Sequence, residues 1–214
     1  MRSNHLPLFS IITATYNSAK TINETIDSLL AQTFKSFEVI IIDGLSTDNT
    51  LIKIKNYNDP RIRINSDKDE GIFDALNKGI SKANGNIIGF LHSDDTLNNK
   101  DTLKVISENF DLDTDGTYGD LCYVSSANPD KIIRNWISNN FSDRSLKFGW
   151  MPPHPTLFLR KAVYDKHGSF KLDYKVSSDY DFILRIFKDS KLTFKYIPHI
   201  VTNMKLGGNS NRDI

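Results

Sequence analysis

Short apolar runs alternate with amphipathic segments along the first half of the chain. Five runs rich in β-branched and aromatic residues predict strands. They cover residues 8–13, 37–42, 61–65, 86–91 and 117–125. Apolar residues recur at helical spacing in four intervening segments. These begin near Ser18, at a cap formed by Ser46 or Thr47, at residue 73 and at residue 101. The alternation predicts an α/β fold with a Rossmann-like, mostly parallel central sheet and helices on both faces.

The second half of the chain is less regular. A strand is predicted near 156–159, a helix over 178–188 and a last strand over 193–201. No low-complexity linker or internal repeat interrupts the sequence. We therefore expect one domain over 1–214, in which the regular part reaches to about residue 125.

Composition narrows the function classes. The chain has 214 residues, and 27 Lys and Arg balance 26 Asp and Glu to a net charge of +1. A dedicated duplex-DNA binder needs a strong basic excess, so no nucleic-acid partner is expected. Cys122 is the single cysteine, which excludes an intrachain disulfide. No apolar run approaches the roughly 20 residues of a membrane-spanning helix, so we expect a cytoplasmic protein with at most peripheral membrane contact.

Polar residues cluster where the predicted parallel strands end. Thr13–Asn17 follow the first strand, Asp43 follows the second, and Asp94–Asp95 follow the strand over 86–91. Ligands of open parallel sheets bind outside the carboxyl ends of their strands. A turn or a helix cap explains one such cluster, but three at one edge indicate a ligand site.

Two of these clusters suggest specific chemistry. Adjacent carboxylates at Asp94 and Asp95 repel each other unless a cation or hydrogen bonds offset the charge, and oxygen ligands suit Mg²⁺ or Mn²⁺. A helix-initiating turn is the alternative interpretation of that pair. Asp43, when ionised, accepts but cannot donate a hydrogen bond, so it would favour the N–H of uracil or guanine over adenine or cytosine.

Several common motifs are absent from the sequence. It contains no G-x-G-x-x-G after a strand, no P-loop and no G-x-S-x-G elbow. The D-x-D-G-T string at 113–117 copies a phosphatase nucleophile motif, but polar residues after a helix precede it. We interpret that string as a solvated turn.

Seven segments together resemble the family-two glycosyltransferases of the GT-A fold, in particular the WcaA-like branch tied to bacterial surface polysaccharides. They occur in the family's order and span nearly the whole chain. The segments are FSIITATYN (9–17), IIDGLSTD (41–48), DEGIFDALNKG (69–79), GFLHSDD (89–95), HPTLF (154–158), SDYD (178–181) and GGNS (207–210). The resemblance implies a nucleotide-sugar-binding half over about 1–125 and an acceptor-binding half over about 126–214.

The resemblance also implies site roles. Asp95 would be the metal ligand for Mn²⁺ or Mg²⁺, Asp179 the general base, and His154 a contact to the acceptor or the phosphates. Trp150 is an acceptor-side candidate in the basic, aromatic stretch 131–150, which core packing or a membrane-surface role would also explain. The donor-binding candidates are Thr13, Ala14, Thr15, Tyr16, Asn17, Asp43, Asp69, Gly71, Asp74, Asn77, Ser93 and Asp94. Two positions depart from the wider family, because Ser93 stands at the first position of D-x-D and Ser178 stands where a Glu often precedes the base.

The implied activity is an inverting, metal-dependent transfer of a hexose or N-acetylhexosamine. The expected donor is a UDP-sugar, with a GDP-sugar less favoured. The expected acceptor is a hydroxyl of a lipid-linked saccharide in O-antigen or capsule assembly. A sugar-nucleotide nucleotidyltransferase is an alternative, although 13–17 lacks that class's glycine-rich basic loop. A non-catalytic nucleotide-sugar-binding domain is the other alternative.

Overall fold

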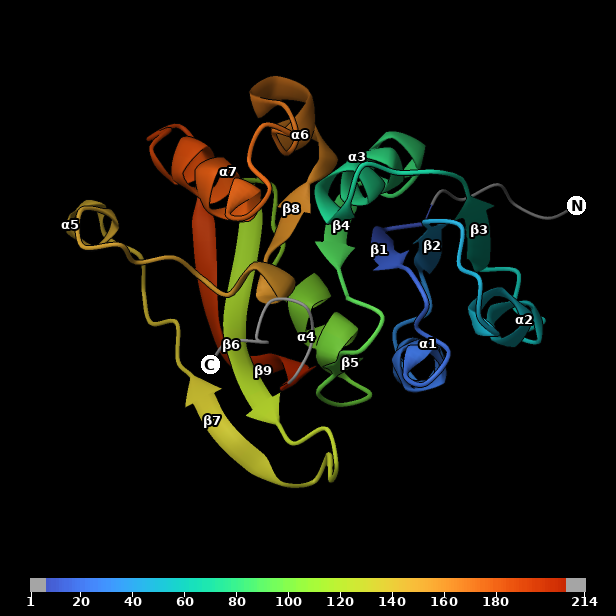
Figure 1. Ribbon diagram of the computed structural model, residues 1–214. Coiled ribbons are helices and arrows are strands. Elements are labelled where there is room, and N and C mark those ends of the chain that lie inside the picture. The colour runs from blue at the N-terminus through green and yellow to red at the C-terminus, as the bar shows by residue number, and fades with distance from the viewer. Residues whose placement is uncertain (1–6, 207–214) are drawn as a thin grey trace, which may run out of the picture.

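The computed structural model describes residues 7–206, so the GGNS motif at 207–210 lies outside the described residues. The chain folds into a mixed α/β structure (Figure 1). Its strands are β1 (Phe9–Thr15), β2 (Phe37–Asp43), β3 (Ile62–Ser66), β4 (Ile87–Phe90), β5 (Thr96–Leu97), β6 (Gly116–Val124), β7 (Ile132–Trp136), β8 (Phe158–Arg160) and β9 (Phe194–Lys205). Its helices are α1 (Ile22–Leu30), α2 (Thr50–Lys55), α3 (Ile72–Lys82), α4 (Thr102–Glu108), α5 (Asp143–Leu146), α6 (Lys161–His167), α7 (Ser178–Phe187) and a 3₁₀ turn at His154–Thr156.

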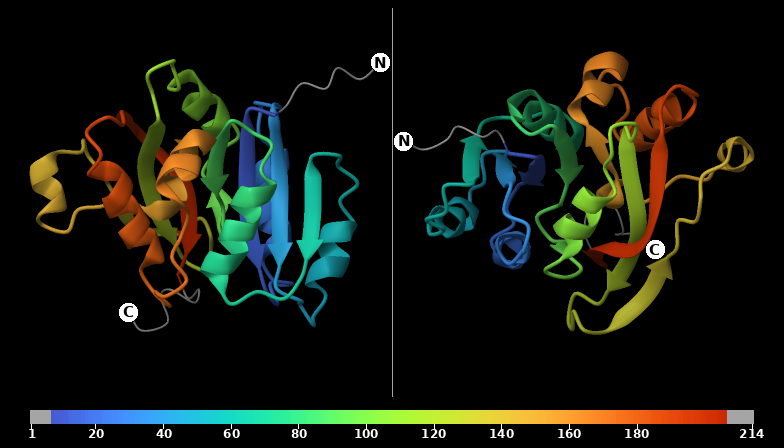
Figure 2. Two further views of the ribbon diagram at one scale, coloured as in Figure 1. Left: turned by 90° about the horizontal axis from the view of Figure 1, so that it is seen from above. Right: turned by 180° about the vertical axis from the view of Figure 1, so that it is seen from behind.

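One sheet runs through the molecule in the order β3-β2-β1-β4-β8-β6-β9-β5, with β7 paired to β6. The strands β1 to β4 are mutually parallel, whereas β8 joins β4 to β6 in antiparallel register. The left view of Figure 2 shows the arrowheads of β1, β2 and β3 pointing toward the same edge. At that edge Thr15, Asp43 and Ser66 are register partners on three neighbouring strands.

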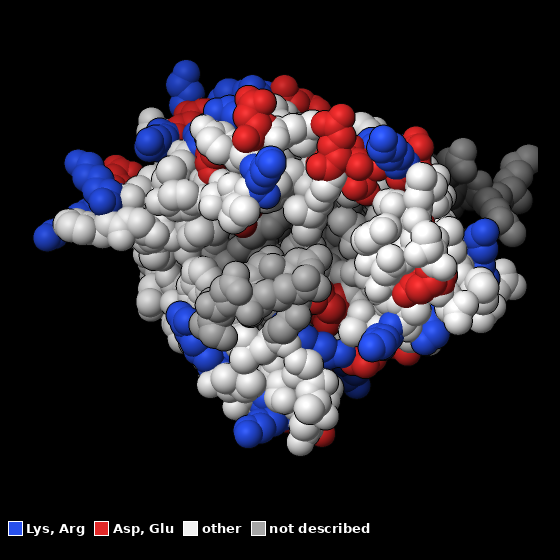
Figure 3. Space-filling model, in the orientation of Figure 1, with Lys and Arg blue, Asp and Glu red and all other residues white. Residues whose placement is uncertain are grey.

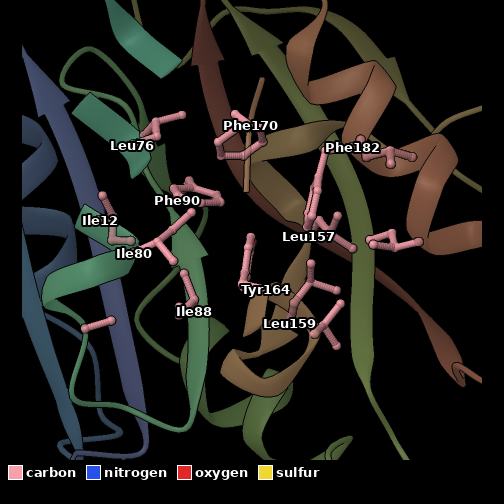
Figure 4. Close-up of a cluster of buried hydrophobic side chains, with 14 of the residues drawn as sticks. Ile12, Leu76, Ile80, Ile88, Phe90, Leu157, Leu159, Tyr164, Phe170 and Phe182 are labelled. Atoms are coloured by element: carbon pink, nitrogen blue, oxygen red, sulfur yellow. The ribbon is translucent and has the colours of Figure 1, made fainter. Parts of the chain in front are cut away.

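Apolar residues alternate between the two faces of the sheet. In β2, Val39 and Ile41 pack with α1, α2 and α4, while Ile40 and Ile42 pack with α3, α6 and α7. Figure 4 shows the second cluster, in which Phe90 and Phe170 lie side by side between the strands and the helices. The expected mostly parallel sheet with helices on both faces is therefore confirmed.

The start of α2 differs from the prediction. Neither Ser46 nor Thr47 caps this helix, which begins at Thr50. The Thr50 N–H donates to Oδ1 of Asp48 at 2.9 Å, and Ser46 is instead held by Asp43. The loop between β2 and α2 is therefore longer than expected. The string at 113–117 is a solvated turn only in part: Asp113 is exposed in a turn, but Thr114 is buried, and Gly116 and Thr117 are the first residues of β6.

A buried carboxylate ties the amino-terminal edge of the sheet together. Glu38 accepts hydrogen bonds from the Ser10 hydroxyl at 2.6 Å, from Arg63 at 2.7 Å and from the Asn84 N–H at 2.7 Å. Burial raises the pKa of Glu38, but these hydrogen bonds outweigh burial and hold that pKa below its ordinary value of 4.5. The contacts connect β1, β2, β3 and the turn before β4.

We expect Glu38→Gln to lower the free energy of unfolding by about 2 kcal/mol at pH 7, because a charged acceptor of several hydrogen bonds is lost. Because the pKa of Glu38 is lower in the folded protein than in the unfolded chain, its carboxylate stabilises the fold fully above about pH 4.5. This stabilisation is lost as the pH falls through the folded-state pKa. The difference between native and variant protein should therefore shrink in acid. Urea unfolding from pH 7 to pH 3 measures it, with Glu108→Gln as control because both partners of the 4.0 Å Glu108–Lys104 pair are more than half exposed. A pH-independent difference would contradict this account.

Candidate active site

The loops after β1 and β2 form one hydrogen-bonded frame at the carboxyl edge of the sheet. The Asn17 side-chain oxygen accepts from the backbone N–H of Thr47 at 2.8 Å and of Asp48 at 3.3 Å. The Asn17 N–H donates to the Ser46 hydroxyl at 2.9 Å. Asn17 and Leu45 both adopt left-handed backbone conformations, with φ of 50° and 61°. Such conformations are costly for residues other than glycine, so the surrounding contacts must hold both loops in place.

Asp43 lies fully buried beneath this frame. Its carboxylate accepts hydrogen bonds from the Ser46 N–H at 3.1 Å, from the Ser46 hydroxyl at 2.5 Å and from the Ser66 hydroxyl at 2.7 Å. A carboxylate has about four acceptor positions, so most of its capacity is already used. Asp43 therefore shapes the loop, in addition to any contact with a base.

Two exposed apolar side chains stand on the same frame. Tyr16 is 63% exposed and Leu45 is 50% exposed, one on each loop. The hydroxyls of Thr13 and Thr15 beneath them are buried without a hydrogen-bond partner, and the neighbouring Ala14 packs against the α3 side of the core. Sequence reasoning missed Leu45, because only its backbone conformation and exposure distinguish it from an ordinary loop leucine.

The segment before α3 divides into two parts. Asp69 lies against the β2 loop, since a Cβ placed on Gly44 would come within 2.5 Å of the Asp69 carboxylate. Gly71 caps α3 with φ of 118°. Asp74 is paired with Lys78 at 2.8 Å and accepts from the Glu70 N–H at 3.0 Å. Asp69 therefore lies at the frame, whereas the carboxylate of Asp74 is used in contacts with Lys78 and Glu70 at the start of α3.

Asn77 has a structural role that the sequence did not reveal. Its amide nitrogen donates to the Phe170 carbonyl at 2.8 Å, and its oxygen accepts from the Phe170 N–H at 3.0 Å. Both polar atoms of the side chain are therefore engaged. The contact anchors the segment that leads from α6 to α7.

The carboxylates after β4 occupy contrasting surroundings. Asp95 is 1% exposed; its Oδ1 accepts from the Lys205 N–H at 3.2 Å, and its Oδ2 has no hydrogen-bond partner among residues 7–206. Burial, and then the charge of Asp94, raise the pKa of Asp95 well above its ordinary value. Ser93 shares a 2.8 Å hydrogen bond with Ser18, which joins this turn to the loop after β1.

A divalent cation fits the carboxylates of Asp94 and Asp95. A buried carboxylate oxygen without a partner is costly, and a cation would relieve both that cost and the repulsion from Asp94. Within residues 7–206, no three His, Cys, Asp or Glu side chains gather to hold a metal by themselves. One or two carboxylates plus substrate phosphates is the usual way in which proteins hold Mg²⁺. The remaining ligands would therefore come from the diphosphate.

Lys205 is a second residue that sequence reasoning missed. Its side chain is 9% exposed, and its ammonium group is paired with Glu24 of α1 at 2.5 Å. The positive charge of Lys205 also lowers the pKa of Asp95, against the larger effect of burial. The sequence pattern predicts that β9 ends at residue 201, so it does not predict that Lys205 continues this strand and contacts Asp95.

Asp179 lies in the first turn of α7, partly buried. Its Oδ1 accepts from the Tyr180 N–H at 2.9 Å, so the carboxylate is held at the helix N-terminus, while the Ser178 hydroxyl donates to the Lys171 carbonyl at 2.7 Å. The negative charge of Asp179 acts on the rings of both His92 and His154. The fold therefore brings Asp179 from the second half of the chain to the end of β4.

Some side chains of the stretch 131–150 pack in the core, and others are exposed on the surface. Trp150 donates from Nε1 to the Ser138 carbonyl at 2.8 Å and packs on Tyr118, Phe141 and Phe187. Core packing therefore describes Trp150. Other apolar side chains of the stretch are at least 49% exposed: Ile132, Ile133, Ile137 and Phe148.

A cavity of about 730 Å³ lies between α5, α7 and the start of β9. Apolar side chains form much of its wall, and Tyr180, next to Asp179, borders it. No donor-site candidate lines this cavity. Its lining residues are Phe141, Asp143, Leu146, Lys147, Tyr180, Leu184, Phe187, Lys188, Asp189, Ser190, Leu192, Thr193 and Phe194.

Comparison with known proteins identifies the class as glycosyltransferases. The profile "Glycosyl transferase family 2" matches residues 10–170. A PGL/p-HBAD biosynthesis glycosyltransferase of Mycobacterium bovis is 34% identical over 96% of this chain and 80% of its own length. The hyaluronan synthase of Pasteurella multocida is 34% identical over 97% of this chain, but over 21% of its own length. The chain belongs to glycosyltransferase family 2.

Solved structures confirm the fold. S. aureus TarS 1–349 in complex with UDP-GlcNAc superimposes with a TM-score of 0.74 at 24% identity, covering 92% of this chain and 58% of TarS 1–349. The mannosyltransferase PcManGT from Pyrobaculum calidifontis, in complex with GDP-Man and Mn²⁺, gives a TM-score of 0.70 at 16% identity, covering 96% of this chain and 59% of its own. The chain thus spans somewhat more than half the length of these structures. The expected GT-A fold and the enzyme class are confirmed. Within residues 7–206, no helix has the length and apolarity needed to cross a bilayer.

Proposed function

We propose that this chain transfers a sugar from a UDP-sugar to a hydroxyl of a saccharide acceptor, with inversion at the anomeric carbon. The observation that supports this most strongly is the convergence of Asp94, Asp95 and Asp179 around His92 and His154. Their nearness supports a site in which Asp94 and Asp95 would bind a cation beside the donor diphosphate and Asp179 would accept a proton. No separate nucleophile is needed for a single displacement.

The chain's own residues supply binding and proton transfer. The frame around Asn17 and Asp43 would hold the nucleotide, while Asp95 and Asp94 would hold a divalent cation that offsets the charge of the departing diphosphate. Asp179 would accept the proton of the acceptor hydroxyl as its oxygen bonds to the anomeric carbon. The bond from that carbon to the diphosphate oxygen breaks in the same step, and UDP leaves.

Two arguments bear on the donor nucleotide: the first favours UDP over GDP, because TarS is the more similar of the two structures, and the second favours both over adenine and cytosine nucleotides. The TarS structure with which this fold aligns holds UDP-GlcNAc, whereas the PcManGT structure holds GDP-Man. Asp43 accepts hydrogen bonds at the carboxyl edge and so suits uracil or guanine. We therefore propose a UDP-hexose or UDP-N-acetylhexosamine, with GDP-sugars as the second candidate.

The acceptor half is proposed to lie over 126–214. The cavity beside Tyr180 is lined wholly by residues within 141–194, and Tyr180 follows the proposed base directly in the sequence, which supports this assignment. The Mycobacterium bovis relative is named for PGL/p-HBAD biosynthesis, and the Pasteurella multocida relative is named hyaluronan synthase. A saccharide acceptor with an apolar, lipid-like portion, as in surface-polysaccharide assembly, fits both observations, and contact with a membrane surface would follow from such an acceptor.

Calorimetric titration with UDP, GDP, ADP and CMP, in Mn²⁺ and in EDTA, tests this proposal. We expect UDP to bind with the highest affinity and EDTA to weaken that binding at least ten-fold, because the diphosphate completes the cation's ligands. A preference for GDP would indicate that the donor is a GDP-sugar. A folded protein that binds none of the four nucleotides would contradict the donor site.

A further inference from the structure

Two buried imidazole nitrogens close to the proposed base have no hydrogen-bond partner within residues 7–206. They are Nδ1 of His92, on the turn after β4, and Nε2 of His154, in the 3₁₀ turn before β8. The ring centroids are 6.3 Å apart, at an interplanar angle of 40°. A buried polar atom without a partner is destabilising by about 1–3 kcal/mol. In a folded protein such an atom calls for an explanation, and a ligand is one.

Aromatic packing fixes the orientation of His154. The Phe90 ring lies 5.0 Å from its centroid, and the Phe170 ring meets it edge-on at 5.3 Å and 89°. Figure 4 shows Phe90 and Phe170 next to each other at this end of the core. Phe170 is itself anchored through its backbone by Asn77. His154 therefore cannot turn freely to find another partner for Nε2.

Both rings lie near the proposed base, and His92 is also two positions from Asp94 in the sequence. The charges of Asp94 and Asp179 both act on His92, and the charge of Asp179 acts on His154. In a single displacement, the anomeric carbon lies between the departing diphosphate and the attacking hydroxyl. Groups close to Asp94 and Asp179 would therefore be within reach of the sugar that is being transferred.

The charge of the His154 ring indicates whether its partner is a sugar hydroxyl or a phosphate. Burial lowers the pKa of His154 to about 4, so this ring is neutral at pH 7. A neutral imidazole has one N–H donor and one acceptor nitrogen, which matches a hydroxyl that can accept or donate. A diphosphate is better served by cationic groups.

We propose that Nδ1 of His92 and Nε2 of His154 bind hydroxyl groups of the transferred sugar and thereby determine which donor sugar the enzyme accepts. The inference rests on the proposed transfer from a UDP-sugar. A sugar that lacks the matching hydroxyl leaves a buried nitrogen unpaired, and sites of this kind discriminate strongly against such analogues.

Amide substitutions test which nitrogen acts. The Asn amide reaches about as far as Nδ1 of histidine, and the Gln amide about as far as Nε2. His92→Asn and His154→Gln should therefore retain binding, whereas His92→Gln, His154→Asn and both Leu variants should lose it. Affinities for UDP, UDP-glucose and UDP-GlcNAc are measured by calorimetry in Mn²⁺.

We expect the two variants that lose the contact at each position, the mismatched amide and the Leu variant, to bind the preferred UDP-sugar about ten-fold more weakly relative to UDP, the effect of one lost hydrogen bond in a buried site. Affinity for UDP itself should change less than two-fold. Equal ratios in all variants would overturn the inference. Native protein that fails to bind UDP would instead overturn the proposed function. If a Leu variant does not fold, the comparison of the Asn and Gln variants at the same position still tests whether the named nitrogen binds the sugar.

Discussion

Asp179→Asn is expected to reduce the turnover of sugar transfer by about 1000-fold, within the range typical for loss of a general base. The amide oxygen can still accept the Tyr180 N–H, which now lies 2.9 Å from Oδ1, so the start of α7 should stay intact. An amide cannot take the acceptor's proton. Since Asp179 is not part of the nucleotide frame, the affinity for UDP should change less than two-fold. Release of UDP in the presence of donor and acceptor measures the loss.

Asp181→Asn is the matched control on the same helix. Asp181 is paired with Lys171 at 3.1 Å and with Arg185 at 2.9 Å. The substitution removes the same charge two residues away. We expect lower stability but retained turnover. An Asp179→Asn enzyme with more than a tenth of native turnover would show that another group accepts the proton.

The regular half of the fold could be predicted because its signals are local. β2 reads FEVIII, and each of its residues is buried, so its apolar run alone predicts the strand. β5 and β7 carried no such signal. β5 has two residues, and β7 is mostly exposed, so neither shows the burial pattern on which sequence reasoning depends. β5 exists because β9, far along the chain, pairs with it, whereas β7 exists because it pairs with β6, the strand just before it.

The candidate site was predictable where residues follow a strand directly. Asp43 and Asp95 could be placed at one edge because parallel strands end together. The partners of Asp95 could not be found in this way. Lys205 reaches it from 110 positions away in the sequence, and Asn77 contacts Phe170 from 93 positions away. Such contacts arise only when the second half of the sheet packs against the first.

We expect Asp95→Asn to be more stable than the native protein without a metal, and less stable than the native protein with Mn²⁺ and UDP. Burial, and then Asp94, raise the pKa of Asp95, so the folded protein holds this proton more tightly than the unfolded chain does. As pH rises above 3.8, the unfolded chain ionises first, and the metal-free folded state loses stability. Asp95→Asn cannot ionise. In EDTA at pH 7 it should therefore melt above the native protein, by about 3 °C for each 1 kcal/mol gained, and the gain should vanish near pH 3.5.

Mn²⁺ and UDP should invert this order. A ligand that binds only the folded state stabilises it in proportion to its occupancy, by about 2.7 kcal/mol at a hundred times its Kd. Native protein should gain that stabilisation, while Asp95→Asn should gain little and should lose most of its transfer activity, because the buried carboxylate that would hold the cation is absent. Asp113→Asn, in the exposed turn before β6, should follow the native protein in both conditions. A melting temperature for Asp95→Asn that rises with Mn²⁺ and UDP as much as the native value would exclude Asp95 as the metal ligand. Since the same carboxylate weakens the empty protein and strengthens the loaded one, the crossing of the two melting curves reports on its function, and neither curve alone does.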